Sequence, residues 1–194
     1  MTEAVAQVSA WIDLHGGDIH EALLPIGEYE SEGNPSVGER SQATLEVFGV
    51  AYAARTYGQP GMALRATTAA GIPSIIAEAG QMGRRDEEHT ALRLRGCRNV
   101  ALLLGIVPGV PLPVPRPKML ARIDWVQAQH KGCWYPAVAV GERIERDQRV
   151  GTLNDYFGNV IAEYRSPSAG VVVLSCTSFA MREQHTLLGV GILA

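Results

Sequence analysis

The first half of the chain contains two short segments whose hydrophobic and polar residues follow strand-like patterns. In residues 11–15 the polar side chains fall at alternate positions, which predicts a strand ending at His15. Two glycines follow at once and stop it. Residues 74–77 are small or apolar throughout, which predicts a second, buried strand that ends at Glu78. Both predicted strands therefore end at a side chain that can ionise.

Apolar residues recur at helical spacing in three further segments, namely 2–10, 41–57 and 86–104. Ser41 and Asp86 stand at the starts of the second and third segments, where their side chains can cap a helix. The pattern of residues 62–67 predicts another short strand. The composition of residues 25–38, which are rich in Gly, Pro, Glu and Ser, predicts a loop. This alternation of strands and helices indicates α/β layering with a mostly parallel sheet.

The pattern changes at residues 108–117, which contain five prolines. Such a segment is stiff and extended and cannot form a helix, so we predict a linker there. After it, short β-type runs follow one another between turn residues, at 124–129, 132–140, 150–153, 160–164 and 171–174. The predicted organisation is an α/β domain over residues 1–108, a linker over 109–119 and a small all-β barrel or sandwich over 120–194.

The overall composition is that of an ordinary globular protein, with 46% hydrophobic and 19% charged residues. A net charge of -3 gives no reason to expect a nucleic-acid partner. Acidic residues interrupt the arginines between positions 84 and 98, so a solvated helix face explains them better than a basic patch. The longest apolar stretch, residues 100–107, is too short to span a membrane, so we expect no membrane partner.

The three cysteines lie far apart in the sequence and form no Cys-x-x-Cys pair. A disulfide framework and a cysteine-type zinc site are therefore not expected, and reduced thiols of a cytoplasmic protein fit best. The N-terminus lacks a basic segment followed by an apolar run, so we expect no signal peptide. These observations predict a cytoplasmic protein.

The stretch around His15 is the most informative one for chemistry. A predicted strand ends in this histidine, Gly16 and Gly17 allow the backbone to turn sharply, and Asp13 and Asp18 flank it. Functional sites of α/β sheets lie beyond the carboxyl ends of strands. Imidazole is a common zinc ligand, and a nearby carboxylate can orient its second nitrogen. On this pattern alone, a metal ligand and an ordinary surface-loop histidine both stay open.

Glu78 is the second candidate for chemistry. It ends the predicted buried strand, and a loop bounded by Gly80 and Gly83 follows it. A carboxylate in that position can act as a general base, although a solvated glutamate at a strand end explains the pattern equally well. No ligand-like neighbours accompany the remaining histidines, which are His20, His89, His130 and His185. We expect His89 to lie on the exposed face of an arginine-rich helix.

With these residues in place, the sequence resembles the succinylglutamate desuccinylase and aspartoacylase family of zinc-dependent deacylases. Residues 13–18, with Glu21 and Pro25, are similar to the family segment that bears its third zinc ligand. Residues 71–83 are similar to the segment that bears its general base. Further likeness runs through the following helix and the β region, at 85–88, 95–100, 150–158 and 166–170.

The resemblance implies a partial carboxypeptidase-like layered α/β domain followed by a β domain. It implies hydrolysis of the amide or ester bond of an N-acylated amino acid or a similar small molecule. His15 would be a ligand of Zn2+, and Glu78 would be the general base that acts on metal-activated water. Asp13 and Asp18 would lie beside the ligand or in the pocket.

The sequence also departs from the family pattern. The first two zinc ligands of the family lie in an H-G-x-x-x-E segment far upstream, whereas only 14 residues precede His15. Since catalytic zinc takes about three protein ligands, we expect this chain to be a C-terminal portion of such an enzyme. The expected partners are a complementing N-terminal segment or a homo-oligomer. The alternative is a non-catalytic or degenerate fragment that serves as an interaction or structural module.

A third hypothesis takes the β region as a carrier domain, because its pattern of strands and turns resembles biotinyl or lipoyl domains. Those domains need an exposed hairpin lysine for attachment, and no lysine follows Lys131. Covalent carriage is therefore not expected, and a structural or lid-like role beside an active site fits the β region better.

Overall fold

A computed structural model describes the chain over residues 8–31, 34–56 and 61–194. The chain divides into two compact units. The first unit comprises Met1–Gly16, Pro25–Gly80 and Arg85–Met119. The second unit comprises Gly17–Leu24, Gln81–Arg84 and Leu120–Ala194. Two short segments from the first half of the sequence therefore belong to the second unit.

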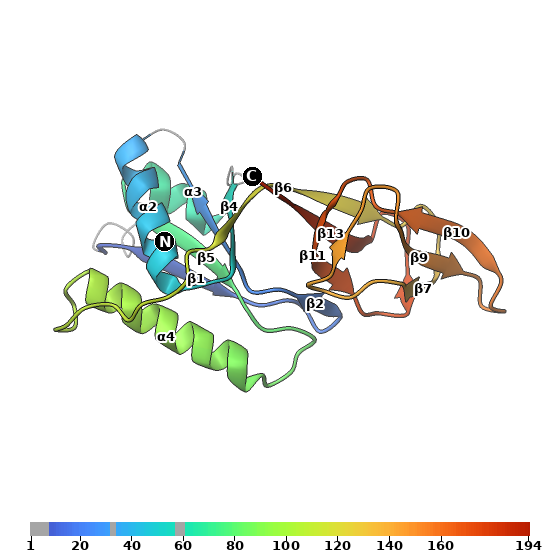
Figure 1. Cartoon of the computed structure of the whole chain (residues 1–194), viewed down its shortest axis with the longest axis horizontal. Helices are drawn as coiled ribbons and strands as arrows, with labels where there is room; N and C mark the ends of the chain where they lie inside the picture. Colours follow the sequence, from blue (N-terminus) through green and yellow to red (C-terminus); the bar gives the residue numbers. More distant parts are fainter. Residues whose placement is uncertain (1–7, 32–33, 57–60) are drawn as a thin grey trace. The chain divides into compact units, whose positions relative to one another are not determined.

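The first unit is built on a mixed sheet whose described strands follow the order β1-β5-β3-β4 (Figure 1). The strands are β1 (Trp11–His15), β3 (Ile26–Glu30), β4 (Tyr52–Thr56) and β5 (Ser74–Glu78). β1 runs parallel to β5 and β3 runs parallel to β4, whereas β5 and β3 are antiparallel. The strands predicted at 11–15 and 74–77 are confirmed, and so is the mixed α/β class.

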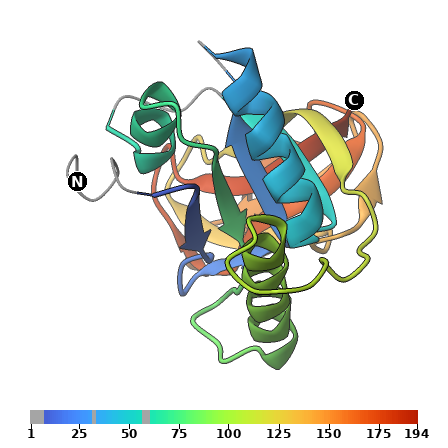
Figure 2. The same cartoon turned by 90° about the vertical axis from the view of Figure 1, so that its left-hand side faces the viewer.

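Two helices share a core with this sheet, α2 (Pro35–Phe48) and α4 (Glu87–Leu103). Figure 2 shows α2 lying across the strands. Phe48 of α2 and Val100 of α4 are buried in one cluster with Ile75 of β5. Gly96 of α4 permits the close approach of the helices, because a Cβ there would lie 2.6 Å from the Phe48 ring. A third helix, α3 (Ala63–Ala69), contacts β1, β3 and β5.

The start of α2 corrects two sequence predictions, the loop over 25–38 and the helix beginning at Ser41. Part of the predicted loop is strand β3, and the helix begins six residues before Ser41, at Pro35. Asn34 caps it by accepting a backbone N–H, and proline in the first turn has no N–H to leave unpaired. Ser41 is instead buried, and its hydroxyl accepts the backbone N–H of Ser74.

Two further predictions for the first unit were wrong. The helix predicted over 41–57 ends at Phe48, because Gly49 takes a left-handed conformation with a φ of 89°. The segment 62–67 is mostly helix α3 rather than a strand. The Thr67 hydroxyl donates to the backbone carbonyl of Ala63, so this β-branched side chain finds its partner within the helix.

The remaining helix predictions have different outcomes. Asp86 caps α4 as predicted, because its carboxylate accepts the backbone N–H of His89. The helix predicted over 2–10 falls mostly on residues 1–7, which lie outside the described residues.

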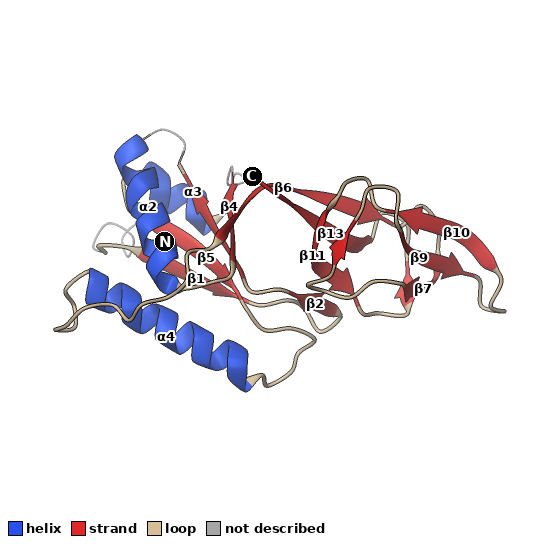
Figure 3. Cartoon of the chain, viewed as in Figure 1, coloured by secondary structure: helices blue, strands red, loops and turns tan. Residues whose placement is uncertain are grey.

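The described residues of the second unit form strands and loops only (Figure 3). One sheet has the order β6-β13-β11-β2, with β8 paired to β11, and the other has the order β10-β9-β7-β12. The strands are β2 (Glu21–Leu23), β6 (Lys118–Gln127), β7 (Gly132–Pro136), β8 (Arg143–Ile144), β9 (Arg149–Asn154), β10 (Val160–Arg165), β11 (Gly170–Cys176), β12 (Ala180–Met181) and β13 (Thr186–Leu193).

All five strand segments predicted for this region contain a strand. The sequence did not predict β13, which carries two glycines among its apolar residues. At Gly189 an added Cβ would lie 2.7 Å from the Trp125 ring, so the glycine makes room for a side chain of the neighbouring strand. The core of the unit contains residues of both sheets, among them Trp134, Leu153 and Leu188.

The proline-rich segment 108–117 contains no helix or strand, as its composition predicts. Buried Asn99 of α4 holds its middle part: the Asn99 side chain donates to the carbonyl of Leu112 and accepts the Leu112 N–H, at 3.0 and 2.9 Å. None of the described helices is long and apolar enough to cross a membrane.

Candidate active site at the strand ends of the first unit

Strand register places four ionisable side chains on one face of the sheet of the first unit. His15 pairs with Glu78 across β1 and β5, and Asp13 pairs with Ile76. Glu28 of β3 pairs with the same Ile76. Directly paired residues, and residues two apart in one strand, point to the same face. Asp13, His15, Glu28 and Glu78 therefore share a face, and the alternate residues of these strands form the core under α2 and α4.

His15 lies between two carboxylates. Its Nε2 is 3.1 Å from Asp13 Oδ1, and its Nδ1 is 3.3 Å from Glu78 Oε1. The side chain of His15 is 46% exposed, and those of Asp13 and Glu78 are 27% and 26% exposed, so a small molecule can reach them. A carboxylate that holds one imidazole nitrogen fixes the orientation of the ring. Asp13 thus leaves the Nδ1 edge of His15 directed toward Glu78.

Glu28 is a further carboxyl group near this pair. Burial is the main cause that raises the pKa of Glu28, and the negative charge of Glu78 raises it further. His15 and a hydrogen bond from Thr56 act in the opposite direction. A raised pKa favours the neutral carboxyl. The sequence did not single out Glu28, because it lies in the segment that was predicted to be a loop.

Arg93 of α4 joins the ends of β1 and β5. Its Nη2 donates to the backbone carbonyls of both His15 and Ala79. Gly16 leaves room for this contact, since a Cβ there would lie 2.9 Å from that Nη2. For Arg93 the predicted solvated helix face is wrong, because the guanidinium lies against two backbone carbonyls. Nothing in the local pattern signals this role, since the acceptors are backbone atoms far away in the sequence.

The prediction for His89 is also wrong. Its side chain is only 12% exposed, and its Nδ1 accepts the backbone N–H of Gly80 at 3.0 Å. Gly80 has a φ of 97°, which is a left-handed conformation that suits glycine. His89 therefore holds the first turn of the loop that follows Glu78.

Asp18, which was predicted to lie near the ligand or in the pocket, belongs to the second unit. Its backbone N–H donates to the Glu21 carboxylate at 3.0 Å, and its carbonyl accepts the Glu21 N–H. These bonds close a short turn before β2. The role of Asp18 in a site stays a prediction. His20, in the same unit, lies with its ring centroid 5.5 Å from that of His185.

The described residues of the first unit do not form a complete set of metal ligands. Over the described ranges, no three side chains of His, Cys, Asp and Glu come together in a way that could hold a metal ion. Catalytic zinc takes about three protein ligands. An imidazole is a common zinc ligand and a partly buried carboxylate can act as a base, so the side chains of His15 and Glu78 are compatible with those two roles.

No protein-family model matches the sequence, and no curated protein matches it. Solved structures do match the fold. A succinylglutamate desuccinylase from Silicibacter sp. TM1040 has a TM-score of 0.88 at 16% identity, over 98% of this chain and 60% of that one. A succinylglutamate desuccinylase/aspartoacylase from Rhodobacter sphaeroides has a TM-score of 0.87 at 19% identity, over 98% and 60%.

A third similar structure is the product-bound ectoine utilization protein EutE (DoeB) from Ruegeria pomeroyi. Its TM-score is 0.85 at 19% identity, over 93% of this chain and 57% of that one. The chain thus has the fold of succinylglutamate desuccinylase and aspartoacylase structures. Its sequence resembles the same family. It spans about 60% of the length of the first of these structures.

Proposed function

We propose that this chain is part of a zinc-dependent hydrolase of the succinylglutamate desuccinylase and aspartoacylase family. Its substrate would be a small N-acylated amino acid or a similar molecule, cleaved at the amide or ester bond. The observation that carries the proposal is the His15–Glu78 pair, whose side chains meet 3.3 Å apart at the ends of two paired strands. In this proposal the first unit is part of a carboxypeptidase-like layered α/β domain, and the strands that follow it in the sequence form a β domain.

Each residue of the pair has a distinct role in the proposal. His15 would be one zinc ligand, with its Nε2 held by Asp13. Zinc, when bound, lowers the pKa of water and polarises the acyl carbonyl. Glu78 would accept a proton from the attacking water and deliver it to the leaving amine.

The groups around Glu78 support its role as a base. Arg93 holds the carbonyl of Ala79, and His89 holds the N–H of Gly80, so the two residues after Glu78 are both fixed. A base must keep a constant direction toward the proton that it removes. The partly buried position of the Glu78 side chain still leaves 26% of it exposed to substrate.

Zinc content tests the assignment of His15. We would measure it by mass spectrometry for the chain alone and for the chain fused to an N-terminal segment that carries the first two zinc ligands of the family, after dialysis against zinc. We expect stoichiometric zinc only in the fused form, and its loss in the His15→Ala variant. His130→Ala changes an exposed histidine of the second unit and should retain the metal.

Hydrolysis of N-acetyl and N-succinyl amino acids tests the activity in the same preparations. Turnover by the fused form and none by His15→Ala is the expected result. Zinc retained by His15→Ala would refute the ligand assignment. A fused form that binds zinc but cleaves none of these substrates would favour the second candidate, a non-catalytic interaction module.

A further inference from the structure

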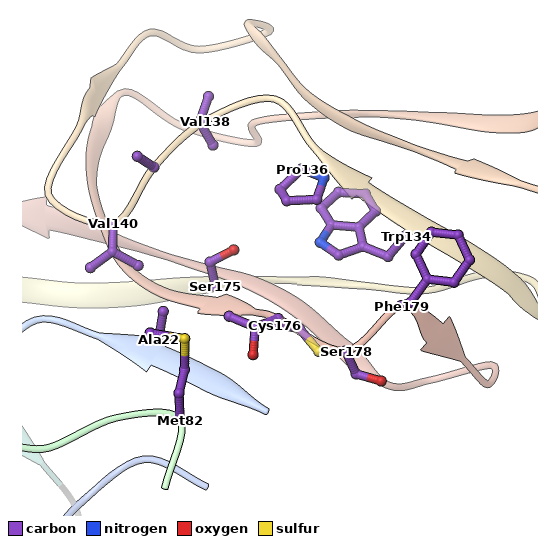
Figure 4. A pocket seen from close by; sticks show the side chains of 12 residues that line it. Ala22, Met82, Trp134, Pro136, Val138, Val140, Ser175, Cys176, Ser178 and Phe179 are labelled. Carbon is purple, nitrogen blue, oxygen red and sulfur yellow. The ribbon is translucent and has the colours of Figure 1, made fainter. Parts of the chain in front are cut away.

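The second unit contains a pocket of about 420 Å³ that is separate from the residues of the candidate active site. Residues of both sheets line it, and none of them is charged (Figure 4). They are Ala22, Met82, Trp134, Pro136, Val138, Ala139, Val140, Ser175, Cys176, Thr177, Ser178 and Phe179. The volume lies in the range of roughly 300–1,000 Å³ that small-molecule sites occupy.

The pocket has a buried floor and an exposed rim. Trp134, Ser175 and Cys176 are 2%, 6% and 1% exposed and form the floor. Pro136, Ala139, Thr177 and Phe179 of the rim are exposed, so the pocket is open to solvent. Burial raises the pKa of the Cys176 thiol, which therefore stays protonated and uncharged at neutral pH.

One polar atom in this floor has no partner. Trp134 Nε1 is buried and makes no hydrogen bond. Figure 4 shows the indole nitrogen on the edge of the ring that faces Ser175 and Val140. A buried donor without an acceptor costs free energy, and buried indole N–H groups usually find a partner.

The packing of the ring prevents Trp134 from finding an acceptor within the protein by turning. The six-membered part of the indole lies over Gly151, where an added Cβ would be 2.3 Å from Trp134 Cη2. Tyr164 packs against the indole edge to face, with 5.7 Å between ring centroids. The donor is thus held in a fixed direction next to the apolar pocket. Its own accessible surface is below 1 Å², so a ligand oxygen reaches it only after a lining side chain shifts.

We infer that this pocket binds a small uncharged molecule, mostly apolar, whose carbonyl oxygen accepts the hydrogen bond of Trp134 Nε1. The apolar lining would release water on binding, and the fixed donor selects a ligand with an acceptor at one position. A charged group is excluded, because no lining side chain compensates for its loss of water. The inference concerns the second unit alone and does not depend on the proposed hydrolase function.

Acetophenone and α-methylstyrene form a matched pair of probes, since they differ only in the replacement of the carbonyl oxygen by a methylene group. Binding would be followed by NMR through the indole N–H signals of the three tryptophans. Replacement of Trp11 and Trp125 by phenylalanine in turn identifies the Trp134 signal without changing the pocket. We expect acetophenone to shift that signal in a saturable way and to bind roughly fivefold more tightly than α-methylstyrene.

Two variants in which phenylalanine replaces an alanine locate the binding site. Ala139→Phe places a ring at the rim of the pocket and should abolish the shift, whereas Ala137→Phe makes the same change at an exposed position outside the lining. The Ala137→Phe protein should bind acetophenone as the parent does. The inference is overturned if acetophenone produces no saturable shift, if both probes bind equally, or if Ala139→Phe binds acetophenone unchanged.

Discussion

The strand-end residues of the first unit and the pocket of the second unit are arranged in opposite ways. At the strand ends, polar groups contact one another: His15 lies between Asp13 and Glu78 at 3.1 and 3.3 Å. In the pocket, apolar packing fixes a single donor, Trp134 Nε1, that has no partner. The first arrangement suits proton transfer, and the second suits recognition of a mostly apolar ligand. In the two proposals, each unit therefore carries a separate chemical capability.

Replacement of the proposed base gives the largest effect expected from this contrast. Glu78→Gln keeps the shape of the side chain but cannot accept a proton, so kcat should fall by a factor of about 10²–10⁴ in the zinc-loaded fused protein. Steady-state hydrolysis of an N-acetyl amino acid measures the change. Glu88→Gln makes the same substitution at an exposed position of α4 and should leave kcat unchanged.

Binding of acetophenone to Glu78→Gln sharpens the comparison between the units. Because Glu78 belongs to the first unit and the pocket lining to the second, we expect the Trp134 signal to respond as in the parent.

The hydrolysis measurement can also contradict the proposed base. A kcat of Glu78→Gln within about threefold of the parent would contradict the role of Glu78 as base, since general bases contribute more than that.

Loss of the Arg93 contacts should give an intermediate effect. Arg93→Met removes the donor to the carbonyls of His15 and Ala79, so we expect the free energy of unfolding to fall by about 2 kcal/mol. Chemical denaturation followed by circular dichroism measures this change. Arg95→Met alters an exposed arginine of the same helix and should change the stability by less than about 0.5 kcal/mol. Equal stability of the two variants would show that Arg93 does not hold the strand ends.

The sequence predicted the positions of the two strand ends better than the contacts around them. His15 and Glu78 were correctly placed at the ends of two strands, because such ends are visible in a local pattern, whereas their chemical roles stay predictions. Their mutual contact depends on the register of β1 and β5, which joins positions 63 residues apart. Arg93 was missed for a related reason. Its acceptors are backbone carbonyls, so no side-chain motif reveals the contact.

The pocket of the second unit was not visible in the sequence at all. It requires side chains from segments as distant as Ala22, Met82 and Phe179 to meet around Trp134. The strands β6, β7, β9, β10 and β11 were predicted, but the order in which they pair is not a local property. An unpartnered indole N–H depends on packing at Gly151, which a pattern of apolar residues cannot show.

The smallest expected effect concerns the hairpin between β9 and β10, where polar groups are exposed rather than enclosed. The Asp155 carboxylate accepts the side-chain N–H of Asn159 and the backbone N–H groups of Asn159 and Phe157, each at 2.9 Å. The side-chain bond from Asn159 is the main cause that lowers the pKa of Asp155, and the backbone bonds lower it further. The ionised form is thus favoured in the folded hairpin.

A lowered pKa in the folded state fixes the sign of the pH dependence. The contribution of Asp155 is fully present above its ordinary pKa of about 3.9 and is lost as the pH falls through the lowered pKa of the folded state. The backbone N–H signals of Phe157 and Asn159 should therefore move together in an NMR titration, with a midpoint below that ordinary value. Asp155→Asn should remove the transition, and a midpoint at or above the ordinary value would contradict the assigned hydrogen bonds. Because Asp155 is at the surface, Asp155→Asn should change the overall stability far less than Arg93→Met does. That difference would show that partly buried polar contacts stabilise this fold more than exposed ones, even where the exposed ones are more numerous.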